Sequence, residues 1–76
     1  MSEAPNEERL AGELEAVITT LDESKVAMTC AREAHDSRDF RTMSEDLWRA
    51  AASAERLAMH YRGAAALAKL ISEGRP

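Results

Sequence analysis

The stretch LAGELEAVITTLDESKVAMTCAREAH, residues 10–35, decides the fold class of this chain. Its apolar positions recur at alternating steps of four and three, which is the heptad period of an α-helix that packs along one stripe. The series runs Leu10, Leu14, Val17, Leu21, Ser24, Met28, Ala31 and His35, with a polar slip at Ser24. Together with Pro5, a residue suited to the first turn of a helix, it predicts a helix over about residues 5–36.

A second heptad series follows in MSEDLWRAAASAERLAMHYRGAAALAKLI, residues 43–71. Its members are Met43, Leu47, Ala50, Ala54, Leu57, Tyr61, Ala64, Ala68 and Ile71. Thr42 and Glu45 have the spacing of a capping box, and Gly74 is a helix stop signal. These signals predict a second helix over about residues 43–73.

The two series are mirror images about Asp39. Most corresponding pairs join a large residue with a small one, as in Leu14 with Ala64, and this is how facing positions fill space. Two helices with mirrored seams and a short connection form an antiparallel hairpin. We therefore predict one all-α domain over residues 1–76, an antiparallel two-helix hairpin with its bend at about 37–42.

A lone hairpin of this length has little core. At 76 residues the chain is in the range where one hydrophobic core rarely supplies more than about 3–5 kcal/mol. The single cysteine, Cys30, cannot form a disulfide within the chain, so association with a second chain is the remaining source of stability. We expect two hairpins to dock as a homodimeric four-helix bundle. The residues predicted to form the dimer interface flank the seam: Ala11, Ile18, Ala51, Ala58 and Ala65.

Charge is unevenly distributed along the chain, whose formal net charge is −4. Residues 1–23 contain seven acidic residues and one base, Arg9, whereas the remainder contains nine bases and seven acids. This asymmetry favours attraction between the two helices or between subunits, and it makes nucleic acid an unlikely partner. No apolar run approaches the roughly 18 residues of a membrane span, and the N-terminus lacks a signal-peptide pattern, so we expect a cytoplasmic protein without membrane contact.

The stretch CAREAHDSRDF, residues 30–40, contains the residue types of metal sites and of acid–base catalysis. On a helix, however, Cys30 and His35 point about 140° away from each other. Neither predicted seam contains an acidic residue, and a di-iron bundle would require Glu-x-x-His pairs and inward glutamates. We predict no metal, no cofactor and no catalytic residue, and interpret the stretch as the corner of the hairpin.

The leading functional hypothesis is a small non-catalytic protein–protein interaction module that binds and regulates a partner protein as a homodimer. The Ala/Arg/Glu bias fits a GC-rich bacterial genome, and small bacterial or phage-encoded regulators, inhibitors and chaperones often have this build. Exposed Trp and Met are common in binding sites, so the partner-binding residues are predicted on the outer side of the second helix: Trp48, Ala52, Met59, Ala66 and Leu70. Two alternatives remain. One is a nucleic-acid-associated regulator that uses the basic stripe Arg49, Arg56, Arg62 and Lys69, and the other is a metal-binding bundle around Cys30, Glu33 and His35.

Overall fold

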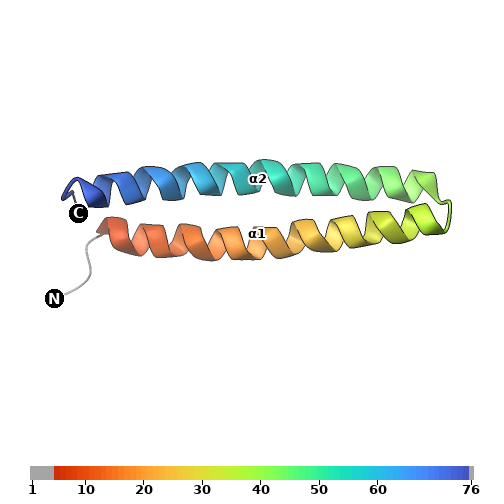
Figure 1. Ribbon diagram of the computed structural model, residues 1–76, viewed down its shortest axis with the longest axis horizontal. Helices are drawn as coiled ribbons and strands as arrows, with labels where there is room; N and C mark the ends of the chain where they lie inside the picture. Colours follow the sequence, from red (N-terminus) through yellow and green to blue (C-terminus); the bar gives the residue numbers. More distant parts are fainter. Residues whose placement is uncertain (1–4, 76) are drawn as a thin grey trace.

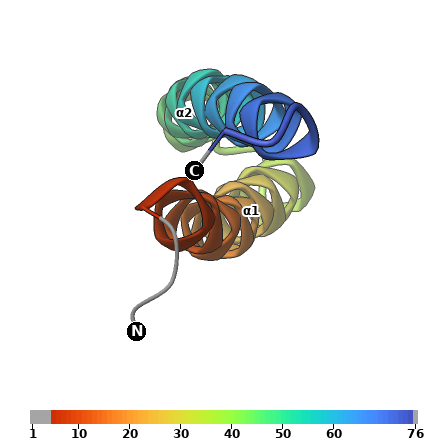
Figure 2. The same cartoon turned by 90° about the vertical axis from the view of Figure 1, so that its left-hand side faces the viewer.

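The computed structural model describes residues 5–75, which form two antiparallel α-helices joined by a short turn (Figure 1). Helix α1 spans Pro5–Asp36 and helix α2 spans Phe40–Ser72, so the predicted all-α hairpin and the limits of the first helix are confirmed. The molecule is a rod with extents of 56 × 19 × 12 Å. Viewed end on, the helices form a single layer, and each one packs against its neighbour along one side only (Figure 2).

The line of contact between the helices, here called the seam, follows the heptad period on both sides. Its residues are buried or half-buried and recur in steps of three and four. In α1 they are Leu10, Glu13, Val17, Thr20, Ser24, Ala27, Ala31 and Ala34. In α2 they are Met43, Asp46, Ala50, Ser53, Leu57, His60, Ala64, Leu67 and Ile71. The most deeply buried of the core residues is an alanine, Ala31, at 1% exposure, and most of the buried residues of the seam have small side chains.

The predicted seam is half right. Every second predicted position, such as Leu10, Val17 and Ala31, lies in the contact between the helices. The other positions are displaced by one residue: Glu13 and Thr20 take the places predicted for Leu14 and Leu21. Small residues along this line let the two backbones approach closely, and the bulky side chains then fall to one side of the contact. Leu14, for example, remains 50% exposed.

Helix α1 ends in a tight turn at residues 37–39. The Arg38 N–H donates to the carbonyl of His35 at 3.0 Å, and the Asp39 N–H donates to the carbonyl of Ala34 at 2.8 Å. This pair of bonds is the Schellman arrangement, which requires a left-handed residue between the last helical turn and the exit. Arg38 occupies that place with φ 56°, a conformation that glycine adopts more easily.

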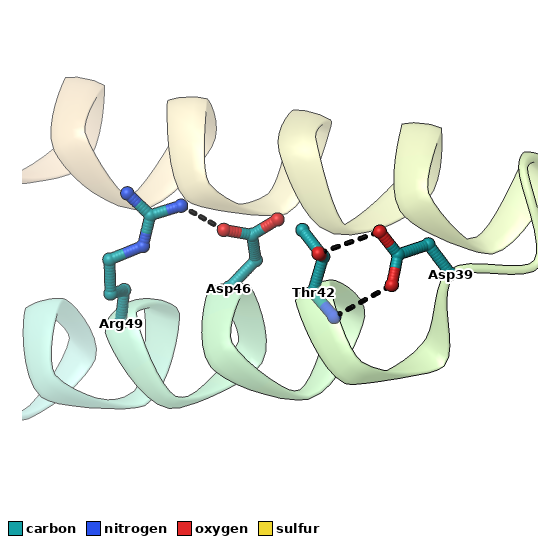
Figure 3. Close-up of polar contacts among 4 residues, drawn as sticks. All are labelled: Asp39, Thr42, Asp46 and Arg49. Carbon is teal, nitrogen blue, oxygen red and sulfur yellow. Dashed lines mark hydrogen bonds and ion pairs between the residues drawn. The ribbon is translucent and has the colours of Figure 1, made fainter.

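Helix α2 begins three residues before the predicted start, because Asp39 and not Thr42 is its N-cap. The Asp39 carboxylate accepts hydrogen bonds from the Thr42 hydroxyl at 2.7 Å and from the Thr42 backbone N–H at 3.1 Å (Figure 3). Both bonds, the hydroxyl one foremost, hold the pKa of Asp39 below its ordinary value of 3.8. Asp and Thr are both good caps, and here the aspartate directly after the turn takes the role. The predicted capping box at Thr42 and Glu45 is therefore wrong.

Candidate interaction faces

The single-layer hairpin presents two long faces, one on each side of the seam. Two contacts between the helices show which residues share a face. On one side, the rings of His35 and Phe40 meet edge to face with their centroids 6.2 Å apart. On the other side, Arg56 Nη2 lies 3.0 Å from Glu23 Oε2. The heptad repeats along each helix, so a residue seven positions before or after one of these four residues lies on the same side of the seam.

The first face, here called the apolar face, carries most of the bulky apolar side chains of the hairpin. Each of its members from Ala11 to His35 and from Leu47 to Ala68 directly follows a seam residue in the sequence. Its members are Ala11, Leu14, Ile18, Leu21, Met28, His35, Phe40, Leu47, Ala51, Ala54, Ala58, Tyr61, Ala65 and Ala68. Its seven large apolar residues are between 39% and 59% exposed. Within the described residues this face contains no Asp or Glu, and Lys25 and Arg32 lie along its outer margin on α1.

The opposite face, here called the polar face, is held by charged contacts within the hairpin. Arg56 bridges Glu23 of α1 and Ser53 of its own helix, the latter at 3.3 Å. His60 Nδ1 lies 2.9 Å from Glu13 Oε2. A Cβ on Gly63 would lie 3.2 Å from that same glutamate oxygen, so glycine leaves the space in which the carboxylate reaches His60.

Asp46 is the one buried acidic residue among residues 5–75, with 4% of its surface exposed. It stands in the seam, and its carboxylate pairs with the guanidinium of Arg49, one turn further along α2 (Figure 3). The arginine itself is mostly exposed on the polar face. Burying a carboxylate is costly unless it is paired, so Arg49 is what makes this position tolerable in the seam.

Next to this pair, the polar face is hollowed into a groove of about 530 Å³. Val26 and Ala52 line it together with Arg49 and Arg56. The groove thus combines an apolar floor with two arginines that already have carboxylate or hydroxyl partners.

The five residues predicted for a dimer interface lie together on the apolar face, at its two outer margins. Ala11 and Ile18 stand on α1, and Ala51, Ala58 and Ala65 stand on α2. Between them lies a broader surface that the sequence analysis placed inside the hairpin: Leu14, Leu21, Met28, Leu47 and Tyr61. The heptad spacing of these residues was predicted correctly. They do not point at the neighbouring helix, as predicted, but lie on the apolar face.

The residues predicted to bind a partner are divided between two places. Ala52, Met59, Ala66 and Leu70 lie on the polar face of α2. Trp48 instead lines a shallow hollow of about 420 Å³ with Phe40 and Leu47, at the turn end of the apolar face. It is 75% exposed, the highest value among the exposed large apolar residues.

The structure separates the residues proposed for metal binding. Cys30 is half-buried and borders a hollow on the polar face with Glu33, whereas His35 contacts Phe40 on the apolar face. Among residues 5–75, no group of three or more His, Cys, Asp and Glu side chains is placed to hold a metal ion. In the basic stripe, Arg49 and Arg56 are paired with carboxylates. Neither helix in the described range is long and apolar enough to cross a membrane.

Comparisons of the chain with protein-family models, with curated proteins and with solved structures found no match. The observations that bear on function are the two faces and the position of Trp48.

Proposed function

We propose that this chain is a non-catalytic protein–protein interaction module of the cytoplasm, which binds and regulates another protein as a homodimer. The observation that carries the proposal is the apolar face. Large apolar side chains follow one another along both helices there, and the hairpin itself does not cover them. Monomeric soluble proteins rarely expose contiguous apolar patches larger than a few hundred Å², and larger ones mark binding sites.

The regulated partner is proposed to bind around Trp48. Trp is enriched among the residues that contribute most to binding free energy, because a large flat side chain loses little conformational entropy when it is covered. Here it stands beside a hollow that Phe40 and Leu47 also line, so a partner side chain inserted at this point would touch three large apolar groups. Trp48 is 75% exposed, so most of its surface is available to a partner.

The test is affinity capture with the full chain immobilised, followed by mass spectrometry of the retained proteins. Replacing Trp48 by alanine should reduce the capture of the specific partner by at least about tenfold, the loss expected for an anchor residue. The helical content measured by circular dichroism should stay unchanged, because the side chain is 75% exposed in the hairpin.

Glu55→Ala is the matched control. Glu55 is one heptad after Trp48 on the same helix and is also exposed, but its side chain is charged and not apolar. It should capture the partner as the unaltered chain does. Equal capture by the Trp48→Ala and the unaltered chain, or no reproducible partner for either, would contradict the proposed role.

A further inference from the structure

We propose that a second copy of the chain covers the apolar face up to the hollow beside Trp48 at its turn end, which stays open to the partner, and that the hairpin is stable only within the resulting four-helix bundle. This inference rests on the proposed function, since it names one partner of the interaction module and assigns it a surface. The sequence predicted a dimer interface along the margins of this face, mainly at alanines. The inferred interface is instead centred on the large side chains between those margins.

The first argument is that the seam alone is too thin to hold the hairpin. Of its buried apolar residues, only Val17 and Leu67 are larger than alanine in the described part of the chain. Each buried methylene contributes about 0.8 kcal/mol, so a line of alanines contributes little against the cost of ordering two long helices. The bulk of the large apolar side chains lies outside the seam, where the hairpin leaves them in water.

The second argument is that the face repeats with the period of a helix-packing surface. Leu14, Leu21 and Met28 recur every seven residues on α1, and Leu47 and Tyr61 do so at two-heptad spacing on α2. Such a repeat is matched by another pair of helices with the same period, which is what an identical hairpin supplies. An extended strand or a globular surface would not match it along its whole length.

The third argument is the distribution of bulk and charge on the face. Four of its seven large residues stand on α1 and three on α2, and α2 also contributes five alanines, which leave gaps between its large residues. A two-fold axis that places α2 of one copy on α1 of the other therefore sets bulk against gaps, as a self-complementary interface requires. Because no described carboxylate lies on the face, two copies can meet without burying acidic groups, and a charged partner would find few charges to pair with.

The apolar face is also large enough for a stable interface. With sides of 56 and 19 Å, the face has a footprint of roughly 1,000 Å², compared with about 800 Å² per partner in stable interfaces of standard size. A second copy laid along the rod can therefore bury an area that is sufficient for a specific dimer.

The experiment uses the purified full chain. Light scattering should give twice the chain mass of 8.4 kDa. The midpoint of thermal unfolding, followed by circular dichroism, should rise over a hundredfold increase in chain concentration, because folding and association are one step. A monomer of 8.4 kDa that melts at the same temperature at every concentration would overturn the inference.

Two matched variants then test the face. Leu21→Glu places a charge on the apolar face, and Val26→Glu places one on the polar face of the same helix; both side chains are exposed in the lone hairpin, at 44% and 62%. Leu21→Glu should abolish the dimer and most of the helical signal at micromolar concentration, whereas Val26→Glu should retain both. Similar behaviour of the two variants would show that the apolar face is not where the second copy binds.

The outcome is separable from that of the proposed function. Trp48-dependent capture of a partner by a folded monomer would overturn this inference and the homodimer of the proposed function, but it would leave the protein-binding role of Trp48 standing. A dimer that depends on Leu21 but captures no other protein would support the inference and contradict the regulatory role.

Discussion

The two faces of the hairpin are built on the same helices and the same seam, yet they are completed in different ways. On the polar face, two arginines pair with carboxylates of the chain: Arg56 with Glu23, and Arg49 with Asp46. On the apolar face, the large side chains have no such partners and stay about half exposed. The hairpin thus pairs several of its charges internally but leaves the large side chains of its apolar face about half exposed. The exposed apolar side chains, and not the charged ones, indicate where a second molecule binds.

The largest expected effect comes from comparing Tyr61→Ala with Met59→Ala. The two residues are two apart on α2 and are 50% and 67% exposed, but Tyr61 lies on the apolar face and Met59 on the polar face. Loss of a large aromatic side chain from a packed core costs roughly 3 kcal/mol or more, whereas exposed substitutions stay within about 0.5 kcal/mol. Urea denaturation at one chain concentration measures the free energy of unfolding of both variants. Equally small losses of that free energy would mean that the two faces do not differ in burial.

Much of this architecture could be predicted from the heptad pattern. The pattern identified two helices, their antiparallel order and the seam positions that Val17 and Ala50 represent. A heptad shows which stripe of a helix is apolar, but not whether that stripe points at the neighbouring helix or obliquely beside it. Leu21 was therefore placed in the seam, where Thr20 actually lies.

The polar residues in the seam also could not be predicted from the sequence. Asp46 belongs to a residue type that is almost never buried without a partner, and its partner, Arg49, is recognisable only once the helix face is known. The same holds for the candidate sites. Trp48 could be identified as exposed from its helical position, but its hollow with Phe40 depends on where α2 begins, and that start was predicted three residues late.

The next effect in size tests the polar face through the pair of Asp46 and Arg49. Arg49→Ala should destabilise the protein by roughly 1–3 kcal/mol, because it leaves a buried carboxylate without its cation. In an Asp46→Asn background the same substitution should cost only a few tenths of a kcal/mol, since a neutral amide needs no counter-charge. Arg41→Ala, at an exposed arginine on the same helix, is the control. Equal costs in both backgrounds would mean that the pair does not stabilise the seam.

A smaller effect is expected at the turn, which belongs to neither face. Arg38→Gly should stabilise the protein by roughly 0.5 kcal/mol, because glycine adopts the left-handed conformation without steric cost but loses more entropy on folding. Gly74, with φ 79°, is the left-handed residue at the end of α2, so Gly74→Arg should shift stability in the opposite direction. Both shifts should be the same at every chain concentration. A shift that grew on dilution would link the turn to association and blur the distinction from the apolar face.

The smallest effect is the pH dependence of the Asp39 cap. The Thr42 hydroxyl and N–H favour the charged carboxylate and lower its pKa below 3.8 in the folded chain, so the stability it contributes is complete above that pH. As the pH falls below 3.8 and through the lowered pKa, the folded carboxylate takes up its proton and the contribution is lost.

Asp39→Ala should therefore lower the melting temperature most at about neutral pH, and the gap to the unaltered chain should narrow in acid. Asp39→Asn keeps an acceptor for the Thr42 N–H and should show a smaller gap at neutral pH. Because the cap lies outside the apolar face and borders a hollow on the polar face, these gaps should not change with chain concentration, unlike the effect of any charge placed on the apolar face. A gap for Asp39→Ala that stays constant from neutral pH into acid would show that the charge of the carboxylate adds nothing to the cap.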